Sequence, residues 1–100
     1  MGLKDSEIKD CVGTGLIVDI WGTGPEETSK SGKIDCIALR ADMDGLPMVE
    51  NNPHLEYTSK TDYAHMCGHD GHMVTQLCTI RVLLNCRGQM PANKLVRVLF

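Results

Sequence analysis

Aromatic residues are scarce in this 100-residue chain, which has one Trp, two Tyr and one Phe. Ile, Leu, Val and Met must therefore fill most of any interior. With 42% apolar residues overall, the composition favours a packed core over a disordered polar chain. Apolar runs approaching the ~20 residues of a membrane-spanning helix are also missing, so we predict no membrane partner.

Positive charge is sparse as well. The formal net charge is −3, and no cluster of Lys and Arg exceeds two neighbours. Proteins that bind phosphate backbones concentrate such residues on one face. We therefore predict that the chain has no nucleic-acid partner.

The five cysteines are an odd number, and no C-x-x-C pair occurs among them. The N-terminus lacks the charged-then-apolar pattern of a secretory signal. Both features argue against a disulfide framework and for reduced thiols. They predict a cytoplasmic location.

Hydrophobic periodicity predicts four elements of secondary structure. Strands are expected over 12–21, 34–41 and 95–100, and a helix over 70–86. The polar residues 1–10 are expected to form a frayed lead-in. The order strand, strand, helix, strand indicates an α/β fold with a helix packed on a sheet.

Local signals refine these elements. The strand over 34–41 is apolar on both faces near its middle, which is typical of a central strand, and Asp70 is the expected helix N-cap. Residues 22–32 are expected to form a turn or an exposed hairpin loop. Residues 42–66 show little periodicity, and a loop of that length in a compact domain usually has a function. Candidate pocket-lining residues in it are Tyr57, Ser59 and Tyr63.

The last predicted strand ends the chain at Phe100 without a following turn. We therefore expect residues 1–100 to be part of a truncated domain.

The first candidate site follows the second strand, in the segment Arg40–Pro47. Ligands in open α/β sheets bind at the strand ends. In extended backbone, Asp42 and Asp44 face the same side and can converge on one cation or one histidine. The alternative is turn chemistry, since Asp before Gly and Pro is common in loops without further function.

The second candidate site is the segment His65–His72, which holds three of the four histidines. Imidazole and thiolate are preferred ligands of zinc and similar divalent metals. Gly68 lets the backbone bend so that Cys67 and His69 reach one ion, and the helix N-terminus favours the thiolate. Asp70 is either the cap or a hydrogen-bond partner of a ligating imidazole. His72 is the weaker candidate.

With both motifs in view, the chain resembles the N-acyl-amino-acid amidohydrolases, a branch of the aminoacylase and carboxypeptidase metallopeptidase superfamily. Hippurate hydrolases, auxin-conjugate hydrolases and N-acetyl-diaminopimelate deacetylases belong to that branch. Its members carry R-A-D-M-D-A-L-P and H-A-C-G-H-D-G-H type sequences in this order. The resemblance implies Cys67 and His69 as metal ligands and Asp44 as the catalytic, metal-orienting aspartate. Asp42 stands where the wider superfamily often has His, so the resemblance assigns it no ligand role.

The resemblance also implies the wider properties of the enzyme. The fold would be a partial three-layer catalytic domain, with a central sheet and a helix after the metal-binding loop. Two divalent ions, Zn or Mn, would support hydrolysis of small-molecule N-acyl amino acids, with a glutamate as general base. That glutamate belongs to a Pro-Ala-Glu-Glu type segment, which this sequence lacks. Because Cys67 and His69 are only two ligands and a catalytic metal site needs at least three, we expect the 100 residues alone to be inactive. A lid or dimerisation domain is absent too, and it would make the full-length enzyme a homodimer.

One alternative from another class remains. A small non-enzymatic module could hold one structural zinc with Cys67, His69, His72 and Cys78. The spacing of these residues is irregular, and the helical phase of Cys78 directs it toward the core. A fragment without a cellular role is a third possibility.

Overall fold

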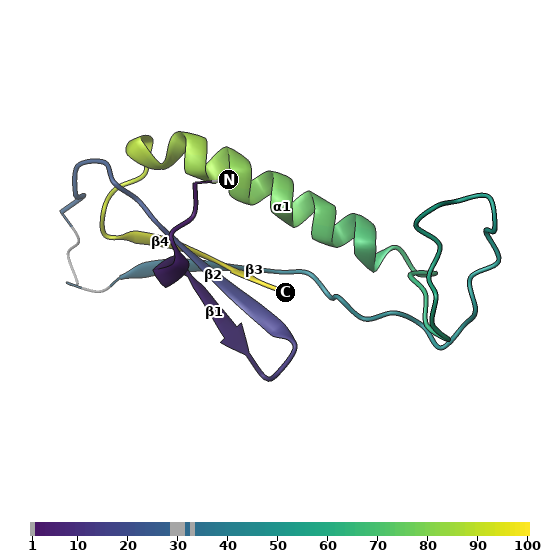
Figure 1. Cartoon of the computed structure of the whole chain (residues 1–100). Helices are drawn as coiled ribbons and strands as arrows, with labels where there is room; N and C mark the ends of the chain where they lie inside the picture. The colour runs from purple at the N-terminus through teal and green to yellow at the C-terminus, as the bar shows by residue number, and fades with distance from the viewer. Residues whose placement is uncertain (1, 29–31, 33) are drawn as a thin grey trace.

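A four-stranded mixed sheet with one long helix across it forms the body of the molecule (Figure 1). The computed structural model describes residues 2–28, 32 and 34–100. In sheet order the strands are β1 (Ile8–Cys11), β2 (Gly15–Trp21), β4 (Lys94–Leu99) and β3 (Asp35–Arg40). The helix α1 spans His69–Cys86, and two 3-10 turns lie at Asp5–Glu7 and Arg87–Gln89. The expected α/β class is confirmed.

The core lies between α1 and the two central strands. Ile20 of β2 and Val98 of β4 are fully buried, and Ile80 of α1 is 1% exposed. Together with Val18 they form one cluster, against which Leu83 and Leu84 pack. The first half of the helix reaches beyond this core, and Leu77 in that half is 43% exposed. Within the described residues, no helix combines the length and apolarity needed to cross a bilayer.

The prediction of a frayed lead-in over residues 1–10 is wrong. Residues Ile8–Cys11 form β1, which pairs antiparallel with β2 in the register Ile8 to Val18 and Cys11 to Gly15. The predicted strand over 12–21 therefore begins at Gly15, after a turn in which Val12 and Gly13 have φ of 50° and 82°. An outer strand contributes few residues to the core, so its sequence lacks the apolar signal of β2.

The central position predicted for the second strand is also wrong. Within the described chain β3 lies at the edge of the sheet, parallel to β4, and Ile37 is 65% exposed. Because β4 lies between β2 and β3, the segment between those strands does not join neighbouring strands and is not a hairpin loop. Its residues 29–31 and 33 lie outside the described part of the chain.

One buried carboxylate stabilises the sheet on the β1 side. Asp19 of β2 is 4% exposed and lies directly opposite Arg97 of β4. It accepts hydrogen bonds from Arg97 Nε at 2.7 Å and Nη2 at 2.9 Å, and from Lys9 Nζ at 3.1 Å. The bonds from Arg97, supported by Lys9, hold the pKa of Asp19 below its ordinary value despite burial.

We predict that Asp19→Asn costs about 1–3 kcal/mol of unfolding free energy at pH 7, as expected for hydrogen bonds to a charged group. The cost stays below that of a fully buried pair because Arg97 reaches solvent. A carboxyl with a lowered native pKa stabilises the fold above its unfolded pKa, and that stability is lost as pH falls through the native pKa. Urea unfolding at pH 7 and at about pH 3 should therefore show the variant and the native chain converging in acid.

Asp10→Asn is the matched control, since Asp10 is exposed on β1. An undiminished stability difference in acid would contradict the role given to the Asp19 carboxylate.

Candidate metal centre

Two backbone features direct the candidate side chains toward one another. After β3, the Ala41 N–H donates to the Leu99 carbonyl at 2.9 Å, which holds the chain beside β4 just before Asp42. Before α1, Gly68 has φ of 96°, a conformation that favours glycine. The helix begins at His69 with Gly68 as N-cap. The prediction of Asp70 as N-cap is therefore wrong, because the left-handed turn at Gly68 starts the helix two residues earlier and leaves Asp70 in its first turn.

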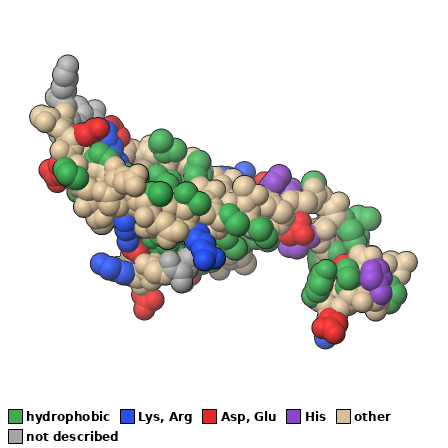
Figure 2. All heavy atoms as spheres, turned by 90° about the horizontal axis from the view of Figure 1, so that it is seen from above, with side chains coloured by type: hydrophobic (Ala, Val, Ile, Leu, Met, Phe, Trp, Pro, Cys, Tyr) green, Lys and Arg blue, Asp and Glu red, His purple; other side chains and the backbone are tan. Residues whose placement is uncertain are grey.

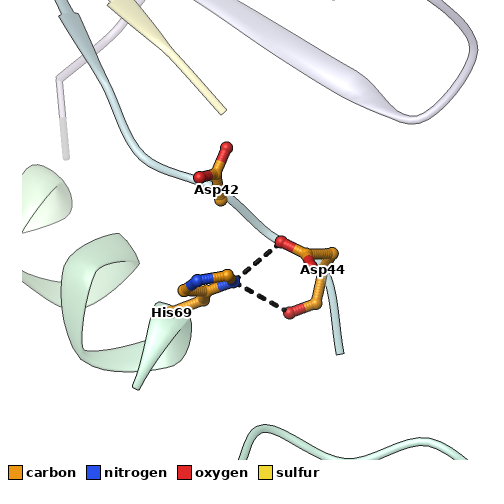
Figure 3. A group of neighbouring side chains, drawn as sticks. All are labelled: Asp42, Asp44 and His69. Carbon is orange, nitrogen blue, oxygen red and sulfur yellow. Dashed lines mark hydrogen bonds and ion pairs between the residues drawn. The ribbon is translucent and has the colours of Figure 1, made fainter. Parts of the chain in front are cut away.

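The structure brings together Asp42, Asp44 and His69, whose potential ligand atoms all lie within 4.8 Å of one another (Figure 3). The His69 ring points from the start of α1 toward Asp44. Its Nδ1 lies 2.7 Å from Asp44 Oδ1 and 3.3 Å from the Asp44 carbonyl oxygen. The loop over residues 42–66 projects from the body of the molecule (Figure 1). Figure 2 shows histidine and acidic side chains gathered where the body meets this projecting loop. The paired aspartates and the His-rich motif, 25 residues apart, thus form one cluster.

The contact with Asp44 fixes which imidazole nitrogen is free. An ionised carboxylate can only accept hydrogen bonds, so Nδ1 of His69 must carry the proton and donate it. The lone pair of the neutral ring is then on Nε2. A histidine held by a carboxylate in this way is typical of metal ligands.

The carboxylate of Asp42 forms an ion pair with Arg40. The side chain of Asp42 is 39% exposed and that of Asp44 65%, whereas His69 is only 21% exposed. The carboxylates therefore remain accessible to an incoming cation while the imidazole is partly enclosed.

Cys67 and His72 flank the cluster without belonging to it. Cys67 is exposed just before Gly68, and the ring of His72 stacks on that of His69 with centroids 6.0 Å apart. Cys78 lies farther along α1 and is exposed, so the prediction that its helical phase directs it into the core is wrong. The core-facing side of α1 is instead centred on Ile80.

A cavity of about 690 Å³ opens beside the cluster. One wall is the segment after β3, and the other is the β1–β2 turn, which had no expected role in the site. Gly13 and Gly15 are the residues from which the sequence could have indicated a turn at this position. The lining residues are Cys11, Val12, Thr14, Gly15, Arg40, Ala41, Asp42, Met43, Asp44 and Phe100.

A second cavity of about 390 Å³ lies within the projecting loop. The loop contains no helix or strand between residues 42 and 66, as expected, apart from a bridge that pairs Leu46 with Ala64. The three predicted pocket residues Tyr57, Ser59 and Tyr63 all line this cavity. The other lining residues are Gly45, Glu50, Ala64, His65 and Asp70.

Known proteins with similar sequences and structures are hydrolases. The chain is 36% identical over 88 residues to an uncharacterized hydrolase of Staphylococcus aureus and 38% identical over 84 residues to an N-acetyldiaminopimelate deacetylase of Streptococcus suis. These matches cover 84% and 83% of this chain, but only 20% and 19% of the relatives. The chain thus spans about a fifth of their length.

A solved structure of a similar protein supports the same relationship. The fold is similar to the crystal structure of the YXEP protein of Bacillus subtilis, described as a dinuclear metal binding peptidase from the M20 family, with a TM-score of 0.72 and 33% identity. The match covers 94% of this chain and 24% of that one. The model of Peptidase family M20/M25/M40 matches residues 38–100, which include the whole cluster of Asp42, Asp44 and His69. The chain therefore belongs to Peptidase family M20/M25/M40.

Proposed function

We propose that this chain is part of the catalytic domain of a metal-dependent hydrolase that cleaves the amide bond of N-acyl amino acids. The observation that carries the proposal is the cluster of Asp42, Asp44 and His69, in which the His69 imidazole donates from Nδ1 to Asp44. The relatives named N-acetyldiaminopimelate deacetylase support an N-acylated amino acid as the substrate class.

The donors present fit a divalent metal. In this proposal His69 binds through Nε2 and Cys67 through its thiolate, a combination suited to zinc and similar ions. The positive φ of Gly68 allows the sharp bend that separates these two ligands. Asp44 keeps the proton on Nδ1 of His69, and Asp42 adds a carboxylate to the same cluster. Two ions, Zn or Mn, are proposed because the similar Bacillus subtilis protein is described as dinuclear.

A bound divalent ion would supply a Lewis acid and a water of lowered pKa. The contribution of this chain is to hold and orient the ligands, and to leave the 690 Å³ cavity open for substrate next to Asp42 and Asp44. The cluster contains no glutamate that could act as general base. We therefore propose that residues 1–100 alone bind metal but do not hydrolyse amides.

The proposal also covers the cellular location and the oligomeric state of the full-length enzyme. All five cysteines of the chain are free thiols, which suits a cytoplasmic enzyme. A homodimer of the full-length protein is proposed on the family resemblance alone.

Titration with Co²⁺ tests the proposed ligand set. For the native chain we expect a near-ultraviolet thiolate-to-cobalt charge-transfer band. Cys67→Ala should remove this band and weaken binding at least ~10-fold, because one ligand is lost. The matched control Cys78→Ala should leave the band and the affinity unchanged, since Cys78 lies nine residues, about two and a half helical turns, beyond His69 on α1.

Loss of the band in Cys78→Ala, with no change in Cys67→Ala, would favour a structural zinc module. Loss of the band in Cys78→Ala would show that Cys78 binds the ion, and an unchanged band in Cys67→Ala would remove Cys67 from the ligands.

A further inference from the structure

The loop over 42–66 is closed on itself by one half-buried carboxylate, Glu50. Glu50 Oε2 accepts a hydrogen bond from the Ser59 backbone N–H at 2.8 Å, and Oε1 accepts one from Asn52 Nδ2 at 2.9 Å. Both oxygens are thus engaged, one of them across nine residues of chain. Glu50 therefore joins the outgoing and returning halves of the loop.

A second connection lies closer to the metal cluster. The Leu46 N–H donates to the Ala64 carbonyl at 2.9 Å, and the Ala64 N–H donates back to Leu46 at 3.0 Å. Between the two connections, Ser59 Oγ donates to the Tyr63 carbonyl at 2.6 Å. Gly45 approaches Ala64 so closely that an added Cβ would lie 3.4 Å from the Ala64 carbonyl oxygen.

These connections lie between Asp44 and His69 along the chain. Asp44 comes two residues before Leu46, and His69 comes five residues after Ala64. No strand or helix joins these two segments, since β3 ends at Arg40 and α1 begins at His69. Between the anchors at Ala41 and Gly68, the path of the loop therefore contributes to the 2.7 Å contact between Asp44 Oδ1 and His69 Nδ1.

We propose that Glu50 is a positioning residue, which holds Asp44 against His69 by closing the loop through the Ser59 N–H. The proposal rests on the proposed metal-binding function, because the Asp44–His69 pair is its centre. Glu50 touches neither residue of the pair and acts only through the loop. The hydrogen bonds from Ser59 and Asn52 lower the pKa of Glu50, so its carboxylate remains an acceptor at neutral pH.

Glu50→Gln tests this with almost no change in size. The Gln amide replaces the charge-assisted bond from the Ser59 N–H by a neutral one of roughly half the strength, and its NH₂ group can no longer accept from Asn52 Nδ2. Glu50→Asp keeps two acceptor oxygens and should recover part of the effect. Glu56→Gln is the control, with the same charge change at an exposed position of the same loop.

Two measurements separate positioning from general stability. The first is the ring ¹⁵N NMR signature of His69 in the metal-free chain, which reports whether Nδ1 carries the proton. Glu50→Gln should lower the Nδ1–H population, while Glu56→Gln should not. The second is Co²⁺ affinity, which should fall about 10-fold in Glu50→Gln, at the low end of losses at residues that orient ligands. The melting temperature should stay close to that of the native chain, because the sheet and Ile80 lie outside the loop.

The outcomes distinguish this inference from the proposed function. If the native chain fails to bind Co²⁺ but Glu50→Gln still shifts the His69 tautomer, the metal function fails and the positioning role stands. If the native chain binds Co²⁺ and Glu50→Gln matches it in both tautomer and affinity, the positioning role is overturned. A lower melting temperature with an unchanged His69 signal would overturn it as well.

Discussion

His69→Ala should lower the affinity of the chain for Co²⁺ or Zn²⁺ by at least about 100-fold. Loss of a residue that only orients a ligand typically costs about 10–100-fold, and His69 is proposed as the ligand itself. It is also the one residue that links the two motifs, through its 2.7 Å contact with Asp44. Isothermal titration calorimetry of the native and variant chains measures the change.

Two further variants make this result specific. Asp44→Asn keeps an acceptor oxygen but loses the charge, so a decrease of about 10–100-fold is expected. His54→Ala removes an exposed histidine of the loop that lies outside the cluster, and its affinity should equal that of the native chain. Equal losses in His54→Ala and His69→Ala would show nonspecific binding and contradict the proposed site.

Gly22→Ala should cost about 3 kcal/mol of unfolding free energy, at the upper end for overpacked sites. A Cβ at Gly22 would lie 2.0 Å from the Pro91 carbonyl oxygen and 2.3 Å from that of Met90. Both neighbours are backbone atoms, so no side-chain rotation can relieve the clash. The Gly22 N–H also donates to the Lys94 carbonyl at 3.1 Å, just where β4 begins. Urea unfolding followed by circular dichroism measures the loss.

Gly88→Ala is the matched control in the facing segment. A Cβ there meets no atom within 4 Å, and replacing a glycine by alanine at a compatible position is neutral or stabilises by about 0.4–1 kcal/mol. If Gly22→Ala were as stable as Gly88→Ala, the close contact between the end of β2 and residues 90–91 would be wrong.

His69→Ala and Gly22→Ala test two features that differ in how clearly the sequence predicts them. The cluster of Asp42, Asp44 and His69 was predicted in part, because its residues stand in two conspicuous motifs. The glycine contact was not foreseen, because Gly22 looks like any turn glycine until β4 is placed beside β2. The same holds for Asp19, whose partner Arg97 is 78 residues away along the chain.

The sequence by itself determined the local elements and the chemistry available to them. Apolar periodicity located β2, β3, α1 and β4, in most cases to within a residue or two, because each repeats over several neighbouring positions. The two motifs predicted which residues offer carboxylate, imidazole and thiolate groups. The assignment of Cys67 and His69 as ligands stays a prediction.

Only the tertiary structure decided which of these groups meet. It placed β4 between β2 and β3, moved β3 to the sheet edge and added β1 from residues that had no strand signal. It also joined Asp42 and Asp44 to His69, while Cys67 and His72 lie beside that group. These outcomes depend on strand pairing and on the path of a 25-residue connection. Such long-range contacts leave no periodic trace in the chain, because the partners are far apart in sequence.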